Sequence, residues 1–199
     1  MEWELFIALL GFSFASSITP GPNNMMLMAS GANFGMARSV PHVAGISIGF
    51  AVMIILVGFG LAQLFEIFPI LNNVLKVAAA LYMTWLAWKI ATAAPKIDAP
   101  EDVGQPFTFI QAALFQWVNP KAWAMALTTV SVYMPETLGF FAPVIVALAF
   151  QILGVPCMVA WNVLGVAMRQ FLTTAGRLRI FNGVMGALLV LSLWPVLVN

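Results

Sequence analysis

The stretch that decides the fold is Ile18-Thr19-Pro20-Gly21-Pro22-Asn23-Asn24. It interrupts the first apolar run of the chain, which has no charged residue between Leu5 and Ala37. Proline has no N–H to donate. Pro20 and Pro22 therefore leave the carbonyls four residues earlier, on Ser16 and Ile18, without their helical hydrogen-bond partners. In lipid, such a break is tolerated only where protein or a water-filled cavity satisfies the backbone. The stretch therefore predicts a broken helix at a substrate or ion site.

The composition is that of a membrane protein. Hydrophobic residues make up 62% of the chain and charged residues 8%, against roughly 25% charged residues in ordinary soluble domains. A single cysteine, Cys157, excludes an internal disulfide, and one histidine leaves no metal-binding cluster. The formal net charge of +1 gives no nucleic-acid signal. We therefore expect a polytopic membrane protein with no metal site, no cofactor and no nucleic-acid partner.

Apolar runs of about twenty residues are long enough to cross the hydrocarbon core of a bilayer. The sequence contains six such runs, which are Leu5–Ser30, Val40–Leu64, Pro69–Trp88, Phe107–Tyr133, Leu138–Met168 and Ile180–Val198. Charged residues and prolines gather between the third and fourth runs, so residues 96–106 are predicted to be a cytoplasmic linker. This linker divides the chain into two three-helix halves, residues 1–95 and 107–199.

The basic residues outside the runs fall in alternate loops, at Arg38, Lys89, Lys96, Arg169, Arg177 and Arg179. The positive-inside rule places these loops in the cytoplasm and both termini outside. Since three spans is an odd number, two similar halves would lie upside-down to one another in the membrane. The predicted fold is all-α, with six transmembrane helices as two inverted three-helix repeats and a proline-broken first helix in each.

A second break lies a hundred residues after the first, at Gln116-Trp117-Val118-Asn119-Pro120-Lys121. Pro120 is expected to free the carbonyl of Gln116. Lys121 lies about fourteen residues, or roughly 20 Å of helix, from either end of its run, too deep for easy snorkelling. No acidic residue lies deep in any run, so its partner would be carbonyls, amides, water or a ligand carboxylate. The alternative is that Lys121 only tethers the carbonyls freed by the broken helix.

The paired breaks suit a zwitterionic ligand. A helix that restarts after Pro22 offers N–H groups and a positive dipole end to a carboxylate, and the carbonyls before it suit an ammonium group. The predicted substrate-binding residues are Pro20, Gly21, Pro22, Asn23, Asn24, Asn119, Pro120 and Lys121. Further candidates are Thr19, Lys76, Tyr82, Gln116, Gln151 and Asn162, for which snorkelling, packing or interhelical hydrogen bonding are the competing interpretations.

Other residues allow two interpretations each. His42 is either a proton shuttle or a polar residue at the membrane interface. The spacings Gly31/Gly35 and Gly45/Gly49 permit close helix approach or the formation of a homodimer. Pro156 is expected to make the fifth span an irregular helix.

Motifs in order along the chain resemble the lysine-exporter superfamily, in its homoserine/threonine-exporter branch. The likeness rests on Thr19–Asn23, Gly35, Gly45–Phe50, Lys76, Ala80–Tyr82, Trp85–Lys89 and Asn119–Lys121. It covers nearly the whole chain. Within the branch, residues 85–91 are most similar to the cysteine/O-acetylserine exporters.

The resemblance implies secondary active export of amino acids or close derivatives across a bacterial inner membrane, driven by the proton motive force. It implies that the family's motif residues are Pro20, Gly21, Pro22, Asn23, Asn119, Pro120 and Lys121. The absence of an acidic residue within the spans favours a neutral substrate. Lys121, His42 or the substrate itself are the candidate proton carriers. The alternative function is a passive channel for small polar solutes. A scaffold would not need the paired breaks, and an intramembrane enzyme would need a histidine or acid near a buried nucleophile such as Ser16 or Ser17.

Overall fold

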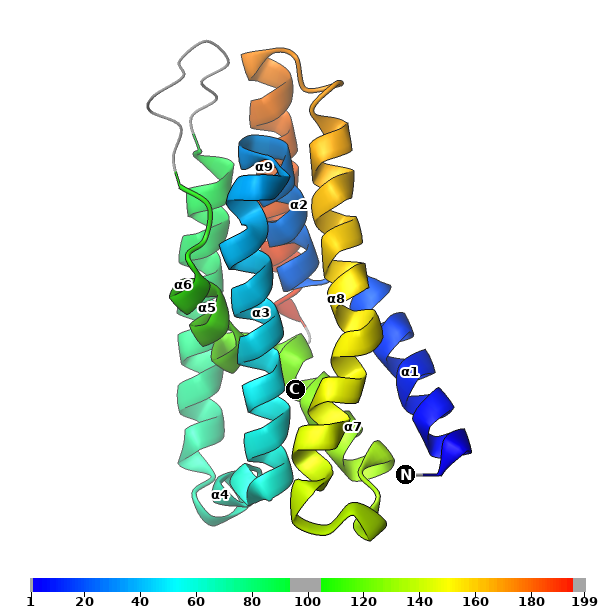
Figure 1. The fold of residues 1–199 in the computed structure, drawn as a ribbon. Helices are drawn as coiled ribbons and strands as arrows, with labels where there is room; N and C mark the ends of the chain where they lie inside the picture. Colours follow the sequence, from blue (N-terminus) through cyan, green and yellow to red (C-terminus); the bar gives the residue numbers. More distant parts are fainter. Residues whose placement is uncertain (1, 94–104, 195–199) are drawn as a thin grey trace.

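The computed structural model describes residues 2–93 and 105–194, which form helices and connecting turns without a β-strand (Figure 1). The first half contains α1 (Trp3–Ile18), α2 (Pro22–Phe34), α3 (Met36–Leu56), α4 (Gln63–Ile67) and α5 (Ile70–Ala91). The second half contains α6 (Phe109–Phe115), α7 (Pro120–Tyr133), α8 (Ala142–Met168) and α9 (Ala175–Leu191). A π-helical turn extends α3, and 3₁₀ turns follow α6 and precede α8. Most of the predicted linker, residues 96–104, lies outside the described residues.

The chain runs back and forth along one bundle (Figure 1). Together α1 and α2 run from one end to the other, α3 returns, and α5 crosses again. The second half begins in the opposite direction with α6 and α7, and α8 and α9 follow. Helices thus occupy all six predicted apolar runs, although the last helix begins at Ala175 rather than at Ile180.

Within the described residues, three helical stretches are long and apolar enough to cross a membrane: Met36–Leu61, Ile70–Ala91 and Thr137–Met168. A fourth is added if α1 and α2, which are bent by 58° at their break, count as one span. The helix α9 has 17 residues, and the second break separates α6 from α7, which have 7 and 14 residues. The chain is therefore an all-helical, multi-pass membrane protein.

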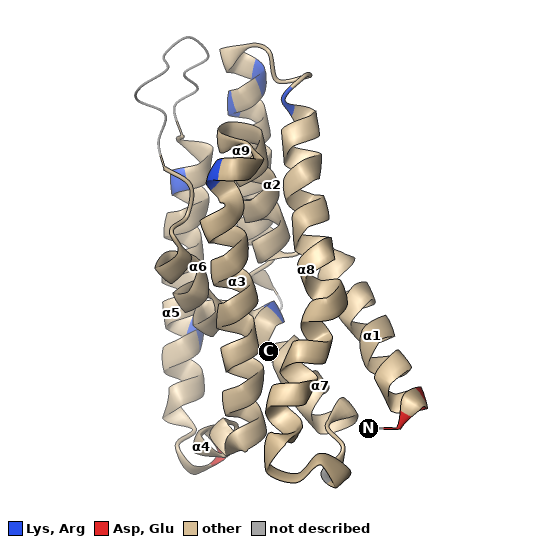
Figure 2. Ribbon diagram, viewed as in Figure 1, with Lys and Arg blue, Asp and Glu red and all other residues tan. Residues whose placement is uncertain are grey.

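Apart from Lys76 and Lys121, the charged residues that the structure describes lie near the two ends of the bundle (Figure 2). Lys and Arg gather where α5 and α8 end and α9 begins, which we call the basic end. Glutamates lie at the opposite, acidic end, near the start of α1 and in α4. The sequence predicts this separation, because its basic residues fall in alternate loops.

Glycines allow the closest helix crossings. A Cβ at Gly31 would overlap the backbone of α8, and one at Gly49 would lie 2.6 Å from the Cα of Ala113 on α6. Gly45 faces the same helix. Gly35 has a φ of 81° and separates α2 from α3, a backbone conformation that favours glycine. The predicted close approach is confirmed, and it occurs within the chain, which explains the spacing without a dimer.

The helix α8 is continuous over its 27 residues although Pro156 lies inside it. The predicted irregularity of the fifth span is therefore wrong. A proline removes only one bond of the helical ladder, and α8 packs along its length against α1, α2 and α3. This packing keeps the helix straight enough to form one wall of the site.

Candidate functional site

The first break lies where the sequence predicts it. The helix α1 ends at Ile18, and α2 begins at Pro22, with Gly21 as an extended N-cap residue. Proline at the first helical position costs nothing, because its missing N–H would have no helical partner there. No side chain caps the N-terminus of α2 within the described residues. Its first N–H groups are therefore available to an anion.

Side chains satisfy the carbonyls that the first break frees. The amide of Asn24 donates from Nδ2 to the carbonyl oxygens of Ser17 at 2.9 Å and Thr19 at 2.8 Å. The indole of Trp161, on α8, donates from Nε1 to the carbonyl oxygen of Ile18 at 3.1 Å. The predicted site for an ammonium group is thus occupied by protein donors in this conformation.

The side chain of Lys121 also contacts the carbonyls at the first break. Its Nζ donates to the carbonyl oxygen of Thr19 at 2.5 Å and lies 3.4 Å from that of Pro20. Only a glycine leaves room for this approach, since a Cβ at Gly21 would lie 2.6 Å from Cδ of Lys121. Of the two predicted roles of Lys121, the structure shows the tether.

The second break is built differently. The chain tightens into the 3₁₀ turn Gln116–Val118, in which the N–H of Asn119 donates to the carbonyl of Gln116 at 3.2 Å. The prediction that Pro120 frees the Gln116 carbonyl is therefore wrong, because a bond across three residues replaces the lost one. The side chain of Asn119 then caps α7 by accepting from the backbone N–H of Lys121 at 3.1 Å.

A reciprocal amide pair joins the two breaks. Asn23 Nδ2 donates to Gln116 Oε1 at 2.8 Å, and Gln116 Nε2 donates to Asn23 Oδ1 at 3.1 Å. Gln116 is fully buried and also donates to the carbonyl of Ala112 at 2.9 Å. The pair fixes the position of α2 relative to the second break.

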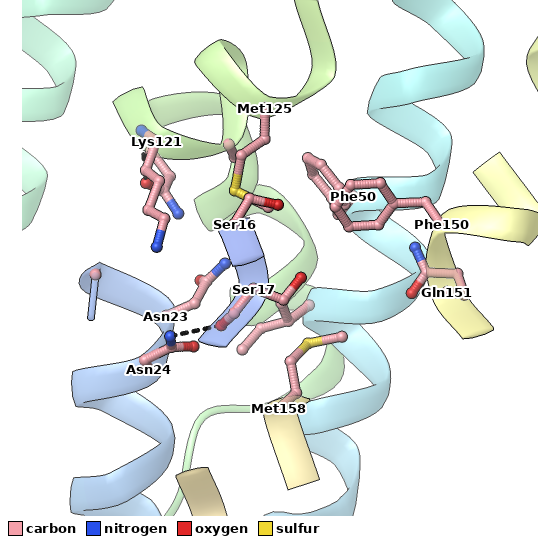
Figure 3. A pocket seen from close by; sticks show the side chains of 14 residues that line it. Ser16, Ser17, Asn23, Asn24, Phe50, Lys121, Met125, Phe150, Gln151 and Met158 are labelled. Atoms are coloured by element: carbon pink, nitrogen blue, oxygen red, sulfur yellow. Dashed lines mark hydrogen bonds between the residues drawn. The ribbon is translucent and has the colours of Figure 1, made fainter. Parts of the chain in front are cut away.

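A small central cavity lies beside these groups, between α1, α2, α3, α7 and α8 (Figure 3). Its volume is about 40 Å³, little more than the roughly 30 Å³ that one water molecule occupies in the liquid. Its lining residues are Ser16, Ser17, Gly21, Asn23, Asn24, Ile46, Phe50, Asn119, Lys121, Ala122, Met125, Phe150, Gln151 and Met158. The cavity is therefore smaller than an amino acid and must widen to accept one.

Six of the predicted site residues line this cavity, namely Gly21, Asn23, Asn24, Asn119, Lys121 and Gln151. Gln151 is held by Ser47, whose hydroxyl donates to its Oε1 at 2.8 Å. Its Nε2 is buried and has no partner among the described residues. This amide is a hydrogen-bond donor available to a ligand in the cavity.

Five other predicted site residues lie near the breaks but do not line the cavity. Pro20, Pro22 and Pro120 shape the backbone, and Thr19 contributes its carbonyl, since its hydroxyl donates to the carbonyl of Ala15. Gln116 lies behind the cavity wall in the amide pair described above.

Three candidates lie away from the central cavity. Lys76 is exposed and lines a separate cavity between α4, α5 and α7. Tyr82 packs against Phe115, with ring centroids 5.9 Å apart. Asn162 is fully buried and donates to the carbonyl of Leu27 at 2.9 Å, which joins α8 to α2. For Tyr82 and Asn162, packing and interhelical hydrogen bonding are the roles that the structure shows.

The sequence analysis did not identify the apolar residues that line the cavity, nor Trp161 on α8 as a hydrogen-bond donor to the first break. Phe50 and Phe150 meet edge to face with ring centroids 5.1 Å apart. Met125 and Met158 complete the wall, and Trp161 caps the first break from outside it. In a chain so rich in apolar residues, no local pattern distinguishes these five from residues that face lipid.

Comparisons with known proteins agree with the motifs. Cysteine/O-acetylserine efflux proteins of Escherichia coli (strain K12) and Shigella sonnei (strain Ss046) are each 30% identical over 181 residues, covering 89% of this chain and 90% of theirs. That of Shigella flexneri serotype 5b (strain 8401) is 30% identical over 177 residues, covering 87% of this chain and 88% of its own. These relatives are named as efflux proteins, not enzymes. No solved structure matches.

The family model for the LysE type translocator matches residues 14–192. This match spans both breaks and all of the cavity-lining residues. The resemblance predicted from the sequence is confirmed, and the chain belongs to the LysE type translocator family.

Proposed function

We propose that the chain is a secondary active exporter of small neutral amino acids or close derivatives, such as cysteine or O-acetylserine. The family and the names of the relatives support export of this class of solute. The single observation that carries the proposal is the ammonium group of Lys121 on the carbonyls freed by the first break. A protein ammonium group on these carbonyls supports their use by the ammonium group of a substrate.

Substrate would bind by exchange. Its ammonium group replaces Nζ of Lys121 on the carbonyls of Thr19 and Pro20. Released from them, Lys121 pairs with the substrate carboxylate, helped by the uncapped N-terminus of α2. The exchange keeps each charged group paired inside the membrane, where an unpaired charge is expensive. The small central cavity must widen in this step.

A neutral side chain fits the rest of the lining. None of the described residues that line the central cavity is acidic, so the side chain of a lysine or arginine substrate would find no counter-ion. The wall formed by Phe50, Met125, Phe150 and Met158 is apolar and polarisable. A short thiol or ester side chain matches this surface.

The six crossings would form two inverted repeats, residues 1–95 and 107–199. Exchanging the halves maps the broken pair α1/α2 onto α6/α7, α3 onto α8 and α5 onto α9. The contact between α3 and α6 then becomes the contact between α8 and α1, and both exist. The contacts of α3 with α8 and of α5 with α9 map onto themselves. This self-consistency supports the repeat.

The basic end would face the cytoplasm of a bacterium, with both termini outside the inner membrane. The sorting of charges between the two ends supports this orientation (Figure 2). The proton motive force would drive export.

Lys121→Met tests the proposal, with Lys76→Met as the matched control because Lys76 lies outside the central cavity. In cells that overproduce O-acetylserine, Lys121→Met should lower export more than about tenfold, the effect of losing some 1.4 kcal/mol of binding. Lys76→Met should export normally. Intracellular and extracellular amino-acid pools are measured at matched expression. Unimpaired export by Lys121→Met would remove Lys121 from the site.

Reconstituted protein separates an exporter from a channel. Proteoliposomes with an imposed pH gradient should accumulate O-acetylserine against its concentration gradient, and collapse of the pH gradient should abolish the accumulation. Equilibration without accumulation would identify a passive facilitator.

A further inference from the structure

His42, near the start of α3, is a buried polar side chain with no polar partner. It is 1% exposed, and neither Nδ1 nor Nε2 has a hydrogen-bond partner among the described residues. Its ring stacks on Phe107 with centroids 5.2 Å apart and planes at 28°. The interfacial role that the sequence allowed is therefore wrong, because the segment before α6 covers the ring. Stacking leaves both ring nitrogens, a donor and an acceptor in the neutral imidazole, unused.

The unused nitrogens belong to a side chain that lines a large cavity at the basic end. This cavity, here called the basic-end chamber, lies between α2, α3, α5 and the start of α6 and has a volume of about 520 Å³. Its polar lining consists of Ser30, Asn33, His42, Lys89, Thr92, Gln105, Thr108 and Gln111. Pockets of small-molecule ligands typically fall between roughly 300 and 1,000 Å³, so the chamber is of ligand-binding size whereas the central cavity is not.

The lining suits a small zwitterion. Hydroxyl, amide and imidazole groups supply hydrogen bonds of both senses, as a carboxylate and an ammonium group require. Of the described residues that line the chamber, only Lys89 is charged, and its Nζ lies 5.3 Å from the centre of the exposed Trp85 ring. Phe107, Leu86 and Met26 form an apolar wall. A solute without net charge can therefore bind in the chamber without needing a counter-ion from the lining residues.

The chamber and the central cavity lie along the same helix faces. On α3, His42 lines the chamber, and Ile46, one turn further, lines the central cavity. On α2, Ser30 and Met26 line the chamber, and Asn23, one turn before Met26, lines the central cavity. Residues spaced by three or four share one face of a helix. The chamber and the central cavity are therefore neighbours along α2 and α3.

We propose that the basic-end chamber is a second binding site for the exported amino acid, in which His42 hydrogen-bonds the amino acid before it moves to the central cavity. The proposal rests on the exporter function proposed above. It assigns His42 a binding role that the motifs of the breaks do not include.

The first test measures transport by His42→Phe and His42→Gln. Phenylalanine keeps the stack on Phe107 but removes both nitrogens, whereas glutamine keeps a donor and an acceptor. In proteoliposomes, His42→Phe should raise the O-acetyl-L-serine concentration for half-maximal transport by roughly tenfold with little change in maximal rate, the pattern of lost ground-state binding. His42→Gln should recover most of this loss. An unchanged half-maximal concentration in His42→Phe would overturn the proposal.

The second test reports binding without transport. In a Cys157→Ala background, Ser30→Cys places a thiol in the chamber, and Ala79→Cys places a control thiol in the separate cavity that Lys76 lines. O-acetyl-L-serine should slow modification of Ser30→Cys by a small methanethiosulfonate reagent at least threefold, and leave Ala79→Cys unaffected. The slowing should disappear when His42→Phe is added.

The outcomes separate this proposal from the exporter function. Uphill transport of O-acetyl-L-serine without protection of Ser30→Cys would overturn the chamber site and keep the function. Protection in a preparation that does not transport would keep the site and reject the function. Failure of both would reject both.

Discussion

The two breaks, at residues 18–22 and 116–120, satisfy their backbones in different ways. The first break uses Asn24 of its own segment and also donors from distant segments, Lys121 on α7 and Trp161 on α8. The second is satisfied within its own segment, by the 3₁₀ turn at Gln116 and by the cap that Asn119 forms on α7. In the first half of the chain, backbone carbonyls accept hydrogen bonds at the break. The second half supplies side chains that donate to them.

This difference assigns the two breaks different parts in a transport cycle. A break that is satisfied by distant side chains can exchange them for a ligand. A break that caps itself has no partner to release and holds its geometry. We expect the first break to rearrange on substrate binding while the second stays fixed, with the Asn23–Gln116 pair as the joint between them.

The largest expected effect comes from Gly21→Ala. The φ of Gly21 is −173°, an extended conformation that alanine adopts freely, so the substitution adds no backbone strain. The added methyl group would lie 2.6 Å from Cδ of Lys121 and would displace its side chain from the carbonyls. Export should fall by more than about tenfold, the result of losing some 1.4 kcal/mol. Amino-acid pools in producing cells measure the loss.

Gly183→Ala is the matched control for this substitution. Gly183 lies in α9, and a Cβ there meets no other group within 4 Å. Export at the wild-type rate is expected. Normal export by Gly21→Ala as well would show that the close approach of Lys121 is not needed, and the contrast between the breaks would lose its functional meaning.

The next largest effect should distinguish Asn24→Ala from Asn119→Ala. Asn24 bonds the carbonyls of Ser17 and Thr19, and Lys121 also donates to that of Thr19. Loss of Asn24 therefore leaves the carbonyl of Ser17 unsatisfied, at a cost of about 1–3 kcal/mol. Asn119 caps its own helix, a role worth about 1 kcal/mol. Asn24→Ala should therefore lower export about tenfold, whereas Asn119→Ala should chiefly lower the unfolding temperature by a few degrees.

Both properties are measured on each variant, export in cells and thermal unfolding in detergent. If Asn119→Ala impairs export as much as Asn24→Ala at equal stability, the second break also takes part in binding. The proposed division between backbone and side-chain donors would then be wrong.

The positions of the breaks could be predicted from the sequence because their cause is local. Pro20, Pro22 and Pro120 lack an N–H, and that fact needs no tertiary structure. The position of Lys121 in the middle of its apolar run followed from counting residues. The sorting of charges between the ends likewise followed from the order of the loops.

The partners at the breaks could not be predicted, because they depend on packing between segments far apart in the chain. Trp161 reaches Ile18 only because α8 crosses α1 and α2 there. The carbonyl of Gln116 remains hydrogen-bonded because the chain forms a 3₁₀ turn there. No residue pattern in the sequence indicates this turn. His42 was placed near the membrane surface by its neighbour Arg38, whereas Phe107 covers it.

Trp161→Phe should have the smallest effect. The substitution keeps an aromatic ring on α8 but removes the Nε1 donor to the carbonyl of Ile18. A single hydrogen bond contributes about 0.5–1.5 kcal/mol, so unfolding in detergent should occur a few degrees lower. Ile18 is not among the carbonyls that Lys121 contacts, so export should change less than twofold. If export instead collapses, the ammonium site extends to Ile18, and α8 as well as α7 supplies a donor that the substrate must replace.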